Sequence, residues 1–178
     1  MDTVLVVAYS LTGTSRRLAD SVCARQQWPL GLVTDARPRT GALGTLRCVV
    51  DSLMGRDPAI RYHGPDPGDF HTLLLVAPVW MSRLAAPMRS FLVQQAGSVH
   101  HVAVLLTMGS GGADHVFLEI ERLIGRAPVL KAAFRASDVR AGAADAPALA
   151  IAESLRGTAR RAVPATAAHL QQENPEWT

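Results

Sequence analysis

The sequence of 178 residues predicts an α/β fold in which a parallel sheet lies between two layers of helices. Two observations support this doubly wound arrangement. Strongly apolar runs alternate with amphipathic helical patterns along the chain, and several of these runs carry no charged residue, as expected of strands buried on both faces. The length suits a single domain with a sizeable core, and a hydrophobic content of 48% excludes wholesale disorder.

Five strands and five helices are expected in alternation. The strands are expected near residues 3–9, 29–34, 72–78, 101–107 and 128–135. The helices are expected near residues 15–26, 42–54, 84–96, 113–125 and 145–162. Pro87 falls in the first turn of the third helix, where its missing N–H does no harm. The Pro- and Gly-rich segment 57–70 is expected to be a loop that crosses the sheet edge.

The first strand leads directly into a turn rich in hydroxyl groups, Ser10-Leu11-Thr12-Gly13-Thr14-Ser15. Free N–H groups and the positive end of the following helix favour a phosphate there, and the hydroxyls would add donors. The turn lacks the lysine of a Walker-type ATP loop and the spaced glycines of a dinucleotide fingerprint. It suits a phosphomonoester such as that of FMN. The alternative is an ordinary helix cap, because Ser and Thr are common N-caps.

Two further strand ends carry features that suit a flat ligand. Pro78 is expected to end the third strand, which places Trp80 on the loop at the sheet edge where open α/β folds bind ligands. A tryptophan there can stack on a heteroaromatic ring, although it could instead pack on its own helix. The fourth strand runs into the segment 107–112, whose glycines would let backbone amides approach a ligand; the alternative is a flexible turn.

These three segments, in this order, resemble the flavodoxin-like FMN-binding family over residues 4–161. The resemblance implies a three-layer, doubly wound, five-stranded parallel sheet with strand order 2-1-3-4-5, and FMN as cofactor. Segment 39–58 also resembles a Gly-x-x-Gly-x-x-Arg helix found in one branch of the family. The cofactor-binding residues that the resemblance implies are Ser10, Leu11, Thr12, Gly13, Thr14, Ser15, Pro78, Val79, Trp80, Met81, Ser82, Thr107, Met108, Gly109, Ser110, Gly111 and Gly112.

The expected function is that of an FMN-binding redox protein, an oxidoreductase of NAD(P)H:quinone type that passes electrons through the flavin. The alternatives are a one-partner electron shuttle and a flavin-free interaction module on the same fold. With 18 Lys+Arg against 15 Asp+Glu, and with no tyrosine in the third loop, the chain differs from the acidic shuttles of the family. No side chain is expected to be catalytic, because FMN itself would supply the chemistry.

The remaining expectations concern organisation and partners. Residues 1–163 are expected to form the domain and residues 164–178 a mobile polar tail. We expect a cytoplasmic protein with no leader and no membrane span, in which Cys23 and Cys48 are reduced core thiols. The six histidines show no metal-ligand spacing, and the charge is too mild to indicate nucleic acid. The expected partner is a small-molecule or protein redox partner, NAD(P)H among the candidates, and a homo-oligomer is compatible with the sequence.

Overall fold

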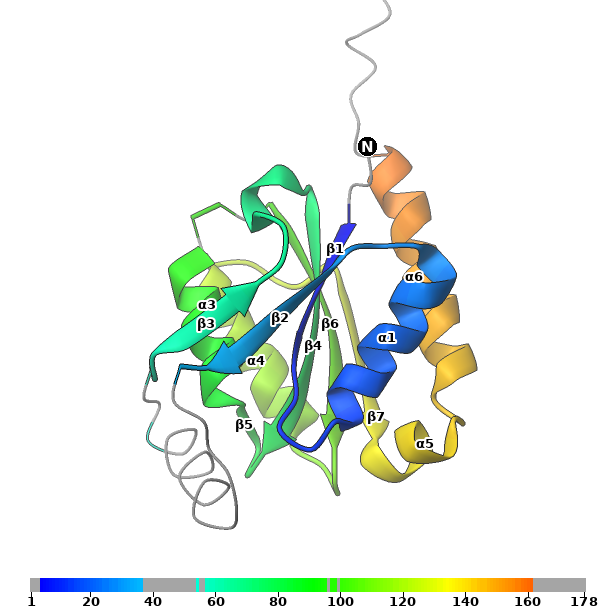
Figure 1. Cartoon of the computed structure of the whole chain (residues 1–178), viewed down its shortest axis with the longest axis horizontal. Coiled ribbons are helices and arrows are strands. Elements are labelled where there is room, and N and C mark those ends of the chain that lie inside the picture. The colour runs from blue at the N-terminus through cyan, green and yellow to red at the C-terminus, as the bar shows by residue number, and fades with distance from the viewer. Residues whose placement is uncertain (1–3, 37–53, 55–56, 96, 99, 162–178) are drawn as a thin grey trace, which may run out of the picture.

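The computed structural model describes residues 4–36, 54, 57–95, 97–98 and 100–161. A central sheet lies between two layers of helices, with α1, α5 and α6 on one face and α3 and α4 on the other (Figure 1). The helices are α1 (Thr14–Gln26), α3 (Ala86–Gln95), α4 (Ala113–Ile124), α5 (Ala136–Ala141) and α6 (Asp145–Arg161), with a 3-10 turn at Pro67–Asp69. The strands are β1 (Val4–Tyr9), β2 (Leu30–Asp35), β3 (Ile60–His63), β4 (Thr72–Trp80), β5 (Arg83–Leu84), β6 (His101–Met108) and β7 (Leu130–Arg135).

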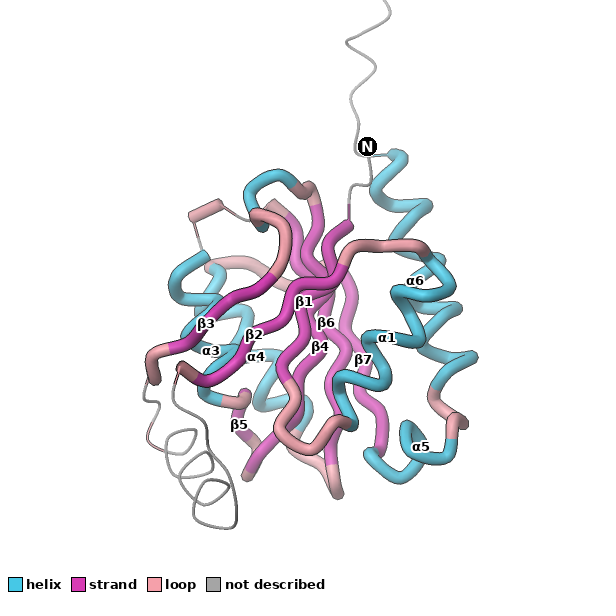
Figure 2. Tube along the Cα trace, in the orientation of Figure 1, coloured by secondary structure: helices cyan, strands magenta, loops and turns pink. Residues whose placement is uncertain are grey.

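The sheet has the predicted topology. Its strand order is β3-β2-β1-β4-β6-β7, and β2, β1, β4, β6 and β7 run parallel. Figure 2 shows the strands in magenta at the centre of the domain, with the cyan helices around them. Numbered among themselves in chain order, these five strands lie in the order 2-1-3-4-5, so the predicted arrangement is confirmed. The remaining strands, β3 and β5, pair antiparallel with β2 and β4.

Each central strand is buried on both faces because its side chains alternate between two hydrophobic clusters. In β1, Leu5 and Val7 belong to the cluster that packs against α3 and α4. Val6 belongs to the cluster that packs against α1 and α6. This explains why the strand sequences are almost uninterrupted apolar runs.

Three local expectations were wrong. Segment 57–70 contains the strand β3 as well as loops, because Ile60 and Tyr62 alternate with polar residues and pack against the core. Strand β4 continues through Pro78, since its last two residues pair with β5; Trp80 therefore ends a strand and does not lie on a loop. The short helix α5 was not expected. Pro87 is the second residue of α3, as predicted.

Other expectations fall outside the described residues. They are most of the helix predicted at 42–54 and of the motif at 39–58, the environment of Cys48, and the tail at 164–178. No helix among the described residues combines the length and apolar character needed to cross a membrane.

Candidate functional site

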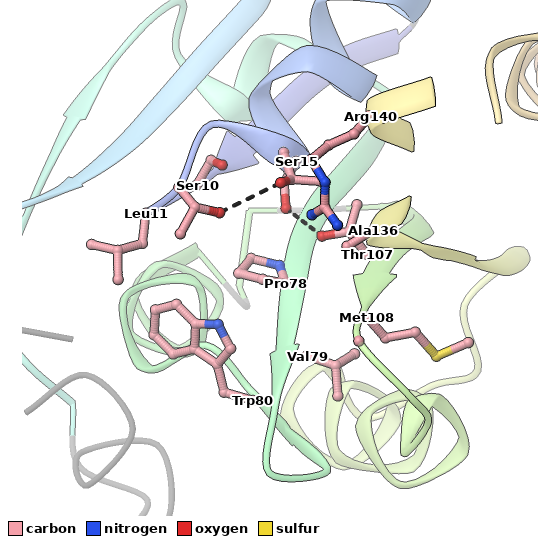
Figure 3. Close-up of a pocket in the computed structure, with 13 residues that line it drawn as sticks. Ser10, Leu11, Ser15, Pro78, Val79, Trp80, Thr107, Met108, Ala136 and Arg140 are labelled. Atoms are coloured by element: carbon pink, nitrogen blue, oxygen red, sulfur yellow. Dashed lines mark hydrogen bonds between the residues drawn. The ribbon is translucent and has the colours of Figure 1, made fainter. Parts of the chain in front are cut away.

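The carboxyl ends of β1, β4 and β6 and the short helix α5 surround a cavity of about 150 Å³ (Figure 3). Its lining residues are Ser10, Leu11, Thr12, Thr14, Ser15, Pro78, Val79, Trp80, Thr107, Met108, Gly109, Ala136 and Arg140. All but Ala136 and Arg140 belong to the segments singled out in the sequence. Strand ends far apart in the chain meet here because the carboxyl ends of parallel strands share one edge of the sheet.

Six predicted site residues do not line this cavity, namely Gly13, Met81, Ser82, Ser110, Gly111 and Gly112. Gly13 and Gly112 have left-handed backbones and begin α1 and α4. Met81 and Ser82 form the tip of the β4–β5 hairpin, also with positive φ angles of 48° and 59°. Gly112 packs directly against this tip, since a Cβ there would lie 2.4 Å from Ser82 Oγ.

The N-terminus of α1 faces the cavity without a side-chain cap. Its N-cap is Gly13 (φ 86°), no side chain accepts from the first-turn amides, and the first turn contains no acidic residue. The Arg17 N–H donates to the Gly13 carbonyl (2.9 Å), so the amides of Thr14 and Ser15 precede the helical hydrogen-bond ladder. The ordinary-cap alternative is therefore wrong, and this helix end retains unused donors and its positive dipole.

Two hydroxyl pairs organise the turn before α1. Ser15 Oγ and Thr107 Oγ1 lie 2.7 Å apart and are buried, which ties the start of α1 to the end of β6. Thr12 Oγ1 and Thr14 Oγ1 lie 3.4 Å apart at an exposed position. The buried pair thus holds the turn in place, whereas both residues of the exposed pair line the cavity.

Trp80 is half-buried and lies between the core and the cavity (Figure 3). Its ring meets Tyr9 edge-on, with centroids 5.9 Å apart and an interplanar angle of 79°. The Tyr9 hydroxyl in turn donates to Asp35 Oδ2 (3.0 Å). These contacts hold the indole in place while part of it still faces the cavity.

Of the two lining residues that sequence reasoning missed, Ala136 and Arg140, the arginine is the charged one. It extends from α5 toward the Ser15–Thr107 pair (Figure 3), and none of the ion pairs between described residues includes it. A signal was present, because a helix directly after the fifth strand must begin at the same sheet edge as the other strand ends. Among the lining residues, Arg140 carries the single formal charge.

Neither cysteine chemistry nor a metal centre is indicated in the described part of the chain. Cys23 is a free thiol on α1. Burial, with a smaller contribution from Asp20, raises the pKa of Cys23 to about 11, so it stays protonated at neutral pH. Among the described residues, no group of three or more His, Cys, Asp and Glu side chains could hold a metal ion.

No protein-family model matches the sequence, and neither does any curated protein. Solved structures do match. A flavoprotein from Lactobacillus acidophilus in complex with FMN has 20% identity and a TM-score of 0.65, covering 79% of this chain and 97% of that one. The apo form of the Lactobacillus acidophilus flavoprotein has 19% identity and a TM-score of 0.57, covering 76% and 92%.

An NAD(P)H:quinone oxidoreductase from Methanothermobacter marburgensis has 12% identity and a TM-score of 0.52, covering 87% of this chain and 100% of that one. At such low identity these similarities show a shared fold. Together with the strand order of the parallel sheet, they show that the chain has a flavodoxin-like fold.

Proposed function

We propose that this protein binds FMN and is an oxidoreductase that passes electrons through the bound flavin. The observation that carries the proposal is the cavity where an uncapped helix N-terminus, a tryptophan and the end of β6 converge. When bound, FMN would supply the redox chemistry, accepting and donating electrons as a hydride or singly. The residues of the chain would bind and orient it.

The start of α1 fits the phosphate group. Backbone amides of Thr14 and Ser15 and the hydroxyls of Ser10, Thr12 and Thr14 would donate to its oxygens. Each charge-assisted hydrogen bond of this kind contributes about 1.5–3 kcal/mol. No carboxylate lines the cavity among the described residues, so nothing there repels an anion.

The remaining walls fit a flat ring. Trp80 would stack on one side of it, and Thr107, Met108 and Gly109 would border its edge. The cavity of about 150 Å³ is smaller than the ~300–1,000 Å³ of ligand pockets that enclose their ligands. A flavin nucleotide would therefore stay partly exposed.

That exposure supports a reductase with NAD(P)H as electron donor and a quinone as acceptor. Hydride transfer requires the donor carbon to approach the acceptor within ~3–3.5 Å, which a covered ring would prevent. The fold shared with an NAD(P)H:quinone oxidoreductase supports the same choice. The formal net charge of +3 would also favour approach of the anionic nicotinamide cofactor over docking of a basic protein.

The test is a flavin titration followed by anaerobic stopped-flow mixing. The protein reconstituted with FMN should lose its oxidised flavin absorbance with NADH or NADPH and regain it with a quinone. If the flavin stays oxidised with both nicotinamides but is reduced by a protein donor, the protein is an electron shuttle. Failure of the folded protein to bind FMN would support the flavin-free interaction module.

A further inference from the structure

We infer that Arg140 is the counter-ion for the phosphate of the bound flavin nucleotide, and that this residue gives the site much of its preference for FMN over unphosphorylated riboflavin. The inference rests on the proposed function and adds to it. Hydroxyls and helix amides alone would form a neutral phosphate site, whereas α5 adds a full positive charge at the cavity wall.

The position of Arg140 is set by its own short helix. The neighbouring Val139 is fully buried in the cluster that packs against α1, which anchors α5 to the domain. The Gly142 N–H donates to the Val139 carbonyl (3.1 Å) and ends the helix at a left-handed glycine (φ 80°). With α5 anchored in this way, the Arg140 side chain extends into the cavity (Figure 3).

The charges around Arg140 leave it available to an anion. The other residues lining the cavity are uncharged, and no described residue forms an ion pair with it. The nearby Arg17 differs, because it does not line the cavity; one of its guanidinium nitrogens lies 3.5 Å from the Cβ position of Gly142 instead. Of these two arginines, Arg140 therefore faces the cavity.

A phosphomonoester matches this arrangement. Its second pKa is near 6, so it is mostly a dianion at pH 7. A guanidinium donates through two parallel N–H groups and binds such an anion bidentately. Riboflavin has the same ring but no phosphate, and thus gains nothing from Arg140. The contact would therefore raise the affinity for FMN relative to riboflavin and leave the binding of the shared ring unchanged.

The experiment measures dissociation constants of the apoprotein for FMN and riboflavin by flavin fluorescence at low and high salt. Arg140→Gln should weaken FMN binding at least tenfold, change riboflavin binding less than twofold, and flatten the salt dependence of FMN binding. Arg140→Lys should recover part of the loss, since it retains the charge. The matched control is Arg25→Gln, an equal charge change in the last turn of α1.

The control is remote from the site. The helix rise puts Arg25 about 17 Å from the start of α1, beyond the Debye length of about 8 Å at physiological salt. At physiological salt and above it should leave both affinities unchanged, and circular dichroism should show that every variant folds. The role of Arg140 would be overturned if the wild type binds FMN and Arg140→Gln binds it equally well. It would also be overturned if Arg140→Gln weakens the binding of FMN and of riboflavin by the same factor. Neither result would contradict the proposed function. Wild-type protein that binds neither flavin would overturn the proposed function, and this inference with it.

Discussion

Two helices begin at the same edge of the sheet with nearly the same backbone, yet we assign a ligand to one of them. Both α1 and α4 follow a left-handed glycine, Gly13 with φ 86° and Gly112 with φ 91°, and neither has a side-chain cap. Each helix end therefore carries unsatisfied amides and a partial positive charge.

The two helix ends differ in what already occupies them. A carboxylate of the chain itself, Asp114, stands in the first turn of α4, and the β4–β5 hairpin tip packs against Gly112. The first turn of α1 holds no acidic residue, and a Cβ at Gly13 would meet nothing within 4 Å. On the proposed function, the comparison indicates that a helix N-terminus can bind an anion where the protein supplies no carboxylate of its own and packs nothing against the capping glycine.

The largest effect should come from giving α1 the internal anion that α4 already has. Thr14→Asp places a carboxylate in the first turn of α1, beside the proposed phosphate position. Two unit charges 4 Å apart near a protein surface repel by about 4 kcal/mol, so FMN affinity should fall at least a hundredfold. Riboflavin affinity should change little, and the apoprotein should gain about 0.3–1 kcal/mol in stability.

Thr14→Asn is the control for this substitution, because it has a similar shape without the charge. Titration with both flavins measures the effect, and denaturant unfolding measures stability. Equal FMN affinities for the Asp and Asn variants would show that no anion binds at this helix end.

The next effect is a difference in stability between alanine variants at the two N-cap glycines, Gly112 and Gly13. Gly112→Ala should lower the free energy of unfolding by about 3 kcal/mol, because left-handed strain adds to overlap with Ser82. Gly13→Ala should cost only about 1–2 kcal/mol, since strain acts there alone. Urea unfolding of the two apoproteins measures the difference; equal losses would contradict the closed packing of the α4 end.

A smaller effect is expected at the tryptophan. Trp80→Ala should weaken FMN and riboflavin by the same factor, about tenfold, because the indole would contact the ring that both ligands share. The bound flavin should also become brighter once the stacked indole no longer quenches its fluorescence. Trp80→Phe, which keeps an aromatic face, should retain most of the affinity. A loss confined to FMN would mean that Trp80 acts on the phosphate end.

The smallest effect concerns the acid that occupies α4. Asp114→Asn removes a charge that interacts with the helix dipole and should lower stability by about 0.3–1 kcal/mol, measured by thermal unfolding. FMN affinity should stay unchanged. A rise in FMN affinity above twofold would indicate that the α4 end also contacts the ligand.

The central strands were predictable because burial on both faces demands uninterrupted apolar runs. The convergence of Ser10, Trp80 and Thr107 was predictable as well, since parallel strands end at one edge. The edge strand β3 was missed because it is four residues long and lies between prolines and glycines.

Arg140 was missed for a different reason. The sheet edge at which β7 ends followed from the predicted topology, but no local pattern shows how the chain turns after β7, and α5 is only six residues long. The closure of Gly112 against the hairpin tip is likewise tertiary. The glycines of segment 107–112 predicted contact between this segment and a ligand. In the structure, Gly112 instead allows close packing against Ser82.

The most direct test of the central claim, that the start of α1 holds a flavin phosphate, is the ratio of riboflavin and FMN dissociation constants for the wild-type apoprotein. The two ligands share the ring and the polyol chain, so the ratio isolates the phosphate. Several charge-assisted hydrogen bonds of about 1.5–3 kcal/mol each predict that FMN binds at least a hundredfold more tightly. Equal affinities would contradict the claim, because the uncapped end of α1 would then contribute nothing to binding.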